Sequence, residues 1–166
     1  MYEVIEATGG QGFWKLAIDG TGQPEPFLPE PAPQSAATLS PDGGWVAYGS
    51  NASGRLEIYV RAFDGSGSSI RVSTSGGSQP LWGRDGRELF YLNATNEIVG
   101  VPVTPGDPPV FGRPEALFRT RIEETPDRQY EVLPDGQHFI LNESSLSLNE
   151  PIVVTTDWQR LLSTSG

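Results

Sequence analysis

Apolar and polar positions in this chain follow the two-residue period of β-strands over many short stretches. Leu56, Ile58 and Val60 alternate with residues 57, 59 and 61, so the two sets face opposite sides of one predicted strand. Residues 45–48 are apolar at every position, which is typical of a strand whose sheet is covered on both faces. Turn-forming residues separate these stretches, and the pattern therefore predicts an all-β chain of short strands.

One type of turn occurs three times, each time just before an apolar strand. Segments 40–48, 83–91 and 133–141 read SPDGGWVAY, GRDGRELFY and LPDGQHFIL. Asp can hydrogen-bond to the local backbone and Gly accepts the left-handed conformation, so each Asp-Gly pair predicts a short loop between two antiparallel strands. Asp42, Asp85 and Asp135 lie 43 and then 50 residues apart. A repeat near forty residues with strand content indicates the blades of a β-propeller.

Two complete blades of four antiparallel strands each are predicted in the middle of the chain. Their strands are expected at 36–39, 45–49, 56–62 and 70–73, and at 79–82, 89–92, 98–103 and 116–118. Pro102 has no backbone N–H, so its strand should lie near an edge at that point or carry a bulge. We expect blade boundaries within a single partial propeller, 1–166, at approximately 1–34, 35–77, 78–128 and 129–166, with the first and last blades incomplete.

The two ends of the chain predict the incomplete blades. Strands are expected at 3–7, 13–18 and 25–28, and at 130–132, 139–141 and 152–155. Trp158, Leu161 and Leu162 have the spacing of a short helix, and a frayed tail is the alternative. Closed propellers typically hold roughly four to eight complete blades. The chain is therefore expected to be part of a larger ring, or to self-associate through its two open blade faces.

Composition and charge exclude several classes of protein. The chain has 166 residues, the size of one domain, and its 20 Gly and 15 Pro are spread as turn residues. It has no Cys, which excludes disulfides and cysteine-based metal sites. The net charge of −10 and the scattered Lys and Arg argue against nucleic-acid binding. No apolar run reaches the roughly 18 residues of a membrane span, no membrane insertion is expected, and the N-terminus is unlike a signal peptide.

Residues that could carry chemistry are few, and each has a simpler interpretation. A hydrolase would need a Gly-x-Ser-x-Gly elbow, which is absent, and would have to use His138, the only histidine, which is expected in the second strand of the last blade. Asp42, Asp85 and Asp135 each sit in a separate turn, so we expect them to be far apart and not to form a metal site. Glu123 and Glu124 are interpreted as a solvated pair. We therefore predict no catalytic, cofactor-binding or metal residue.

Aromatic and asparagine positions are interpreted as structural. The four tryptophans recur with the blades, and core packing between blades explains them better than sugar stacking; they are Trp14, Trp45, Trp82 and Trp158. Three Asn-x-Ser/Thr patterns begin at Asn51, Asn93 and Asn142. These patterns match the acceptor for glycosylation, but we interpret the asparagines as turn residues.

The repeats resemble the TolB-like, WD-type propeller repeats of bacteria. The matching segments are the turn at 40–43, the apolar strand that ends at Tyr48, residues 58–63, residues 71–82 and residues 84–92. The resemblance covers about residues 35–162. More narrowly, the segment 151–154 with Trp158 and the following leucines resembles the end of the C-terminal propeller of bacterial serine/threonine kinases and winged-helix regulators. The chain departs from the pattern at Arg84, where the turn proline would stand, and at Leu133, where a serine would stand.

The resemblance implies a non-catalytic module for protein or peptide binding or sensing. Such a module would be the C-terminal part of a larger bacterial protein, such as the sensor region of a kinase, and no kinase motif lies on this chain. It would be extracytoplasmic if the larger protein is a membrane-anchored sensor; otherwise the compartment stays open. One alternative is the propeller of a prolyl-peptidase-like hydrolase whose catalytic domain is not on this chain. Another is a truncated reading frame with no independent role.

Overall fold

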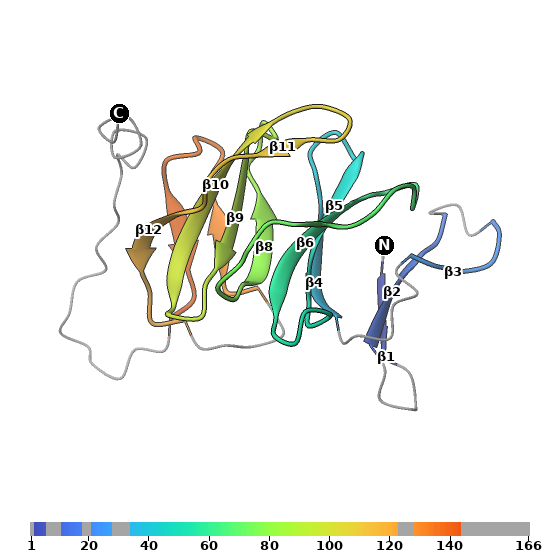
Figure 1. Ribbon diagram of the computed structural model, residues 1–166, viewed down its shortest axis with the longest axis horizontal. Helices are drawn as coiled ribbons and strands as arrows, with labels where there is room; N and C mark the ends of the chain where they lie inside the picture. The colour runs from blue at the N-terminus through green and yellow to red at the C-terminus, as the bar shows by residue number, and fades with distance from the viewer. Residues whose placement is uncertain (1, 6–10, 18–20, 28–33, 123–127, 144–166) are drawn as a thin grey trace.

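A computed structural model describes residues 2–5, 11–17, 21–27, 34–122 and 128–143 of the chain (Figure 1). Within these residues, 14 strands form four antiparallel sheets and no helix is present. The sheets follow one another along the chain and stand side by side in Figure 1. This arrangement confirms the predicted all-β partial propeller. Among the described residues, none forms a helix with the length and apolar character that a membrane crossing requires.

Each sheet is built from consecutive strands. The first holds β1 (Tyr2–Ile5), β2 (Gln11–Lys15) and β3 (Glu25–Pro26). The second holds β4 (Gln34–Leu39), β5 (Trp45–Ser50), β6 (Glu57–Ala62) and β7 (Ile70–Arg71). The third holds β8 (Ser78–Trp82), β9 (Glu88–Leu92), β10 (Glu97–Thr104), β11 (Val110–Phe111) and β12 (Glu115–Arg119). The fourth holds β13 (Tyr130–Val132) and β14 (Phe139–Leu141).

Burial on both faces explains the continuous apolar run of β5. Side chains alternate along a strand, so Val46 and Tyr48 pack against Phe13 and Phe27 of the first-sheet region. Ala47 faces the other way and joins the core shared with the third sheet. The apolar residues of β9 divide in the same manner between the cores on its two sides. The middle sheets are thus covered by a neighbour on each face, as blades of a propeller are.

The three Asp-Gly turns form as predicted. Each glycine has a positive φ, +73° at Gly43, +70° at Gly86 and +65° at Gly136, which a residue with a Cβ adopts only with strain. In each turn the aspartate Oδ1 accepts a hydrogen bond from the backbone N–H two residues later, over 2.9–3.0 Å. Local chemistry alone therefore closes the three loops.

Pro102 lies in β10 where the partner strand changes. β10 pairs with β12 over residues 97–100 and with β11 over residues 103–104. The Pro102 carbonyl accepts a hydrogen bond from the Gly112 N–H on that side, while the Val103 N–H points the other way, to the carbonyl of Arg87. A backbone N–H at position 102 would point to the same side as the Pro102 carbonyl. That side is the outer edge of the sheet, where pairing with β12 has ended and pairing with β11 has just begun. This confirms that the strand is near an edge at the proline.

Two irregular residues were not anticipated from the sequence. The first strand of each complete blade carries a register shift, with Ala36 at φ +45° in β4 and Gln79 at φ +53° in β8. Strand β11 was not predicted either. The expected strand at 152–155 and the short helix or tail around Trp158, Leu161 and Leu162 lie outside the described residues.

Candidate functional site

A pocket of about 310 Å³ opens between the second and third sheets, at the end of the blades that carries the Asp-Gly turns. We call it the turn pocket. Three loops line it: the β4–β5 turn, the β8–β9 turn and the β10–β11 connection. In Figure 1 the β10–β11 connection arches at the top of the view toward the upper end of β5. The pocket is at the lower end of the roughly 300–1,000 Å³ typical of ligand pockets.

Two tryptophans form part of the apolar wall of the turn pocket. Trp82 is only 7% exposed, and its ring centroid lies 6.3 Å from that of Phe111. Trp45 is half-buried and packs against the same interblade core. The predicted packing of Trp45 and Trp82 in the core between blades is therefore confirmed. The same two residues also line the turn pocket. Trp14 is half-buried in β2, and Trp158 lies outside the described residues. Prolines 41, 105 and 109 complete the apolar surface.

Two carboxylates, those of Asp42 and Asp85, also line the turn pocket. Hydrogen bonds from the Ser40 hydroxyl and the Gly44 backbone N–H hold the pKa of the Asp42 carboxyl below its usual value, so it is ionised at neutral pH. Asp85 forms an ion pair with Arg87, with Nε 4.0 Å from Oδ2 and both side chains largely exposed. The pocket thus combines an aromatic wall with two negative charges.

The position of these aspartates corrects the sequence prediction. The three turn aspartates were expected to be far apart, but Asp42 and Asp85 line one pocket. Their turns touch, because a Cβ placed on Gly86 would lie 3.6 Å from Cδ of Pro41. Asp135 is not in the lining. No group of three or more His, Cys, Asp or Glu residues suited to a metal ion occurs in the described part of the chain.

One buried donor of Trp82 has no hydrogen-bond partner among the described residues. This donor is Nε1, which is inaccessible to solvent and so does not open onto the turn pocket. Buried polar groups are normally hydrogen-bonded, so an unmet donor of this kind lowers the stability of the fold. Two further buried nitrogens, Arg61 Nε and Gln79 Nε2, also have no hydrogen-bond partner in the part of the chain that the structure describes, and neither residue lines the turn pocket.

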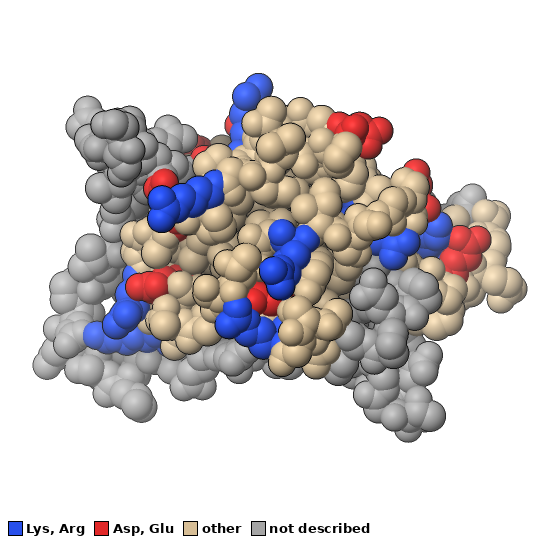
Figure 2. Space-filling view, viewed as in Figure 1, with Lys and Arg blue, Asp and Glu red and all other residues tan. Residues whose placement is uncertain are grey.

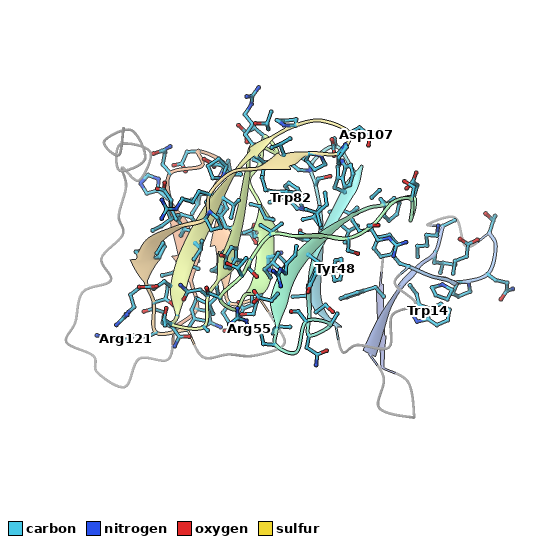
Figure 3. All side chains as sticks on the ribbon, viewed as in Figure 1. Trp14, Tyr48, Arg55, Trp82, Asp107 and Arg121 are labelled. Carbon is cyan, nitrogen blue, oxygen red and sulfur yellow. The ribbon has the colours of Figure 1, made fainter. Side chains whose placement is uncertain are left out.

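A second pocket, of about 260 Å³, lies at the opposite end of the same two blades. Figure 3 shows Arg55 at this lower end and Asp107, in the β10–β11 connection, at the upper end. Behind the pocket the Glu57 carboxylate, 1% exposed, accepts hydrogen bonds from Arg55 Nε over 2.5 Å, from the Gly76 N–H over 3.1 Å and from the Ser73 hydroxyl. Burial, together with the negative charge of Glu57, raises the pKa of Tyr91 to about 12. This network holds the loop before β8 in place.

His138 lies one residue before β14 and not within the strand, which corrects its predicted position. Its Nδ1 is 2.6 Å from Oδ2 of Asp135, and its side chain is 43% exposed. Backbone hydrogen bonding from Gln137, followed by the contact with His138, lowers the pKa of the Asp135 carboxyl. The contact with Asp135 therefore stabilises the turn that directly precedes His138. Glu123 and Glu124 lie outside the described residues.

Two of the asparagines in glycosylation-like patterns act as turn residues, as predicted. The Asn51 carbonyl accepts a hydrogen bond from the Gly54 N–H over 2.8 Å. Oδ1 of Asn93 accepts hydrogen bonds from the backbone N–H groups of Thr95 and Glu97, each over 2.9 Å. Asn142 donates through Nδ2 to Oε1 of Gln129 over 2.8 Å and so joins the start of β13 to the end of β14.

Charged side chains do not gather into a basic surface on the face shown in Figure 2. Lys and Arg residues there are scattered over several elements and are interspersed with Asp and Glu. A nucleic-acid-binding face normally concentrates positive charge. The visible face offers no such concentration.

Comparisons with known proteins identify the fold. Neither a protein-family model nor a curated protein sequence matches the chain. Among solved structures it is similar to TolB from Acinetobacter baumannii, with a TM-score of 0.64 and 19% identity, over 81% of this chain and 32% of that one. It is also similar to a putative TolB from Agrobacterium tumefaciens, with a TM-score of 0.63 and 20% identity, over 84% of this chain and 48% of that one. The chain therefore has a TolB-like β-propeller fold and spans less than half the length of either structure.

Proposed function

We propose that this chain is a non-catalytic module that binds a protein or peptide partner through the turn pocket and the loops around it. The observation that carries the proposal is the pocket itself, which joins two tryptophans, three prolines and two carboxylates from adjacent blades. Sites of this kind combine an apolar wall with a few polar groups that fix the orientation of a ligand. The functional residues are then Trp45, Trp82, Asp42 and Asp85.

A peptide-display selection tests this proposal. Random peptides are selected on the immobilised chain, and enriched peptides are titrated against the soluble chain by fluorescence anisotropy. We expect micromolar binding, and we expect backbone amide shifts in NMR spectra to map to residues 40–45, 85–86 and 105–109. Shifts confined to the pocket around Arg55 would move the site to the other end of the blades. Failure of every selected peptide to bind in solution would overturn the proposal.

We further propose that the module belongs to a larger bacterial protein, such as the sensor region of a kinase. The support is the resemblance of segment 151–154 and Trp158 to the end of kinase-linked propellers, which lies outside the described residues. Sequencing the DNA on either side of this reading frame tests it. A kinase or winged-helix domain in frame would support the proposal, and a hydrolase domain would support the alternative.

Self-association through an open blade face is also proposed. Phe139 of β14 packs toward the third sheet, so its neighbour Ile140, 61% exposed, faces the opposite side. Exposed apolar side chains on an uncovered sheet favour contact with another chain. Light scattering at micromolar concentration should show a dimer or larger species, and Ile140→Lys should shift it toward monomer. A wild-type chain that stays monomeric would contradict the proposal.

A further inference from the structure

We propose that Asp85 is a modification site, where the bond to Gly86 isomerises to an isoaspartyl linkage faster than at any other described Asp-Gly pair. The described residues hold four such pairs, and all four aspartates are exposed; they are Asp42, Asp64, Asp85 and Asp135. A following glycine has no side chain to shield its backbone nitrogen. Asp-Gly pairs are therefore the places in this chain where that nitrogen reaches the preceding carboxyl most easily.

The isomerisation needs no second reactant. The backbone nitrogen of Gly86 attacks Cγ of Asp85, so that a C–N bond forms and a carboxyl C–O bond breaks. One water leaves, made from the carboxyl hydroxyl and the amide proton, and a five-membered succinimide remains. Water then adds to one of the two ring carbonyls. Opening at the former backbone carbonyl leaves the chain running through Cγ, which is the isoaspartyl product, and opening at the other carbonyl restores aspartate.

The attacking nitrogens are held alike in the four pairs, so the carboxyls decide the order. Each glycine N–H donates to the carbonyl three residues earlier, over 2.8–3.0 Å. Among the described residues, Oδ1 of Asp85 accepts one hydrogen bond, from the Arg87 N–H over 2.9 Å, and Oδ2 has the exposed ion pair with Arg87 at 4.0 Å. Exposed pairs of this kind contribute little. The Asp85 carboxyl can therefore turn toward Gly86 at the cost of one hydrogen bond.

Two of the other carboxyls are held by one hydrogen bond more. Oδ1 of Asp42 accepts from the Ser40 hydroxyl over 2.5 Å and from the Gly44 N–H over 3.0 Å. Ser66 binds the Asp64 carboxylate through its backbone N–H, over 2.7 Å, and also through its hydroxyl. Each of these carboxyls has to give up an additional hydrogen bond before Cγ can meet the glycine nitrogen.

The Asp135 carboxyl is held more firmly still. Its Oδ1 accepts hydrogen bonds from the N–H groups of Gln137 and His138, over 2.9 and 3.2 Å, and its Oδ2 lies 2.6 Å from Nδ1 of His138. At Asp42, Asp64 and Asp135, hydrogen bonding within the turn is the largest cause that holds the pKa of the carboxyl below its usual value. Ring closure proceeds from the protonated carboxyl, whose hydroxyl leaves as water. The same hydrogen bonds therefore slow these three positions in two ways.

Isomerisation at Asp85 changes the contact between two blades. The isoaspartyl linkage adds one carbon to the backbone of the β8–β9 turn and shortens the side chain by the same carbon. This turn touches Pro41, because a Cβ placed on Gly86 would lie 3.6 Å from its Cδ. Both Asp85 and Gly86 also line the turn pocket. The modification thus alters the pocket without any change in the sequence.

Peptide mapping of the incubated chain tests the site. The folded chain is kept at mildly acid pH, digested with chymotrypsin and analysed by electron-transfer mass spectrometry, which distinguishes isoaspartyl from aspartyl fragments. Chymotrypsin cleaves after aromatic residues and leucine, so each Asp-Gly pair falls on its own peptide. Isoaspartate should accumulate at residue 85 about three- to tenfold faster than at the other three aspartates, the ratio that one hydrogen bond provides. In urea the four rates should lie close together, because every pair has the same glycine.

Variants test the cause of the order. Asp85→Glu keeps the charge but would have to close a six-membered ring, so methyl transfer to the incubated chain by an isoaspartyl methyltransferase should lose most of its signal. Asp135→Glu is the matched control and should leave that signal nearly unchanged. Ser66→Ala removes one hydrogen bond from Asp64 at an exposed position. It should raise the rate at Asp64 about threefold or more.

Four results would each overturn the inference. The first is a folded chain in which another described pair reacts first or all four react equally, and the second is the same order of rates in urea as in the folded chain. The third is a folded chain that forms no isoaspartate while the chain in urea does. The fourth is an unchanged rate at Asp64 in Ser66→Ala, since hydrogen bonds would then not set the order.

Discussion

The hydroxyl of Tyr130 donates a hydrogen bond to the main-chain carbonyl of Gln79 over 2.7 Å, which ties β13 to β8 of the neighbouring sheet. Tyr130 is 3% exposed, and burial raises its pKa well above the ordinary value. Gln79 is the positive-φ residue of the irregular strand β8, and its side-chain Oε1 accepts a second hydrogen bond from the Gln129 N–H over 2.7 Å. An irregular backbone in one blade thus provides the polar contacts that hold the next.

Tyr130→Phe should destabilise the chain by about 1–2 kcal/mol, because it leaves the buried Gln79 carbonyl without its donor. Urea unfolding followed by tryptophan fluorescence measures the change. Tyr59→Phe is the matched control, since Tyr59 is half-buried and its hydroxyl makes no hydrogen bond to the described residues. Equal free energies of unfolding for the two variants would show that the interblade hydrogen bond contributes nothing.

Glu57→Ala should cost about 2–5 kcal/mol of stability, because it leaves the Ser73 hydroxyl proton and the buried Gly76 N–H without their acceptor and creates a void. Glu25→Ala serves for comparison. That carboxylate forms an ion pair with Lys15 over 3.2 Å, but its side chain is 68% exposed, so its loss should cost less than about 1 kcal/mol. Chemical denaturation of both variants gives the two values. If Glu57→Ala also lost less than about 1 kcal/mol of stability, Glu57 would not be holding the loop before β8 in place.

Gly77→Ala should destabilise the chain by about 1–3 kcal/mol through overpacking. An added Cβ would lie 2.8 Å from Cγ1 of Ile58 and 2.9 Å from Oγ of Ser73, both buried. The control is Gly44→Ala, whose Cβ would meet nothing closer than 3.5 Å, at the exposed Asp42 side chain. Thermal melts should show a lower Tm for the first variant alone. A Gly77→Ala chain as stable as wild type would mean that the loop can shift freely.

Glu88 should make stability depend on pH. Burial, followed by the negative charge of Asp85, raises its pKa from 4.5 to about 7. Between these values the folded chain keeps a proton that the unfolded chain releases, so stability falls as pH rises from about 4.5 to 7 and then levels off. The carboxyl is only half-buried and water screens part of the effect, so we expect a loss of about 1 kcal/mol.

The Glu88 prediction is checked by urea unfolding of wild type and Glu88→Gln at pH 5 and pH 8. The variant lacks the titrating carboxyl, so the difference in stability between it and wild type should grow in its favour at pH 8. The double comparison removes the contribution of every other titrating group. A difference that is the same at both pH values would show that the Glu88 carboxyl titrates normally.

Features that depend on a few neighbouring residues were predictable. The turns at Asp42, Asp85 and Asp135 close with hydrogen bonds inside the turn itself, and the strands flanking them begin and end within a few residues of the predicted bounds. The packing of Trp45 and Trp82 between blades also followed from their place in repeated strands. The irregular residue Gln79 was missed, because its positive φ is stabilised by contacts with residues 129 and 130 and no local sequence signal marks it.

The amino-acid sequence by itself determined the turns, the strand period and the propeller architecture, since backbone preference and alternate burial act over a few residues. Only the tertiary structure decided that the turns of Asp42 and Asp85 meet and line one pocket together with two tryptophans. Residues 43 positions apart approach one another there because adjacent sheets pack face to face. That packing depends on side chains throughout both blades, so neither turn carries a local signal of the pocket they share.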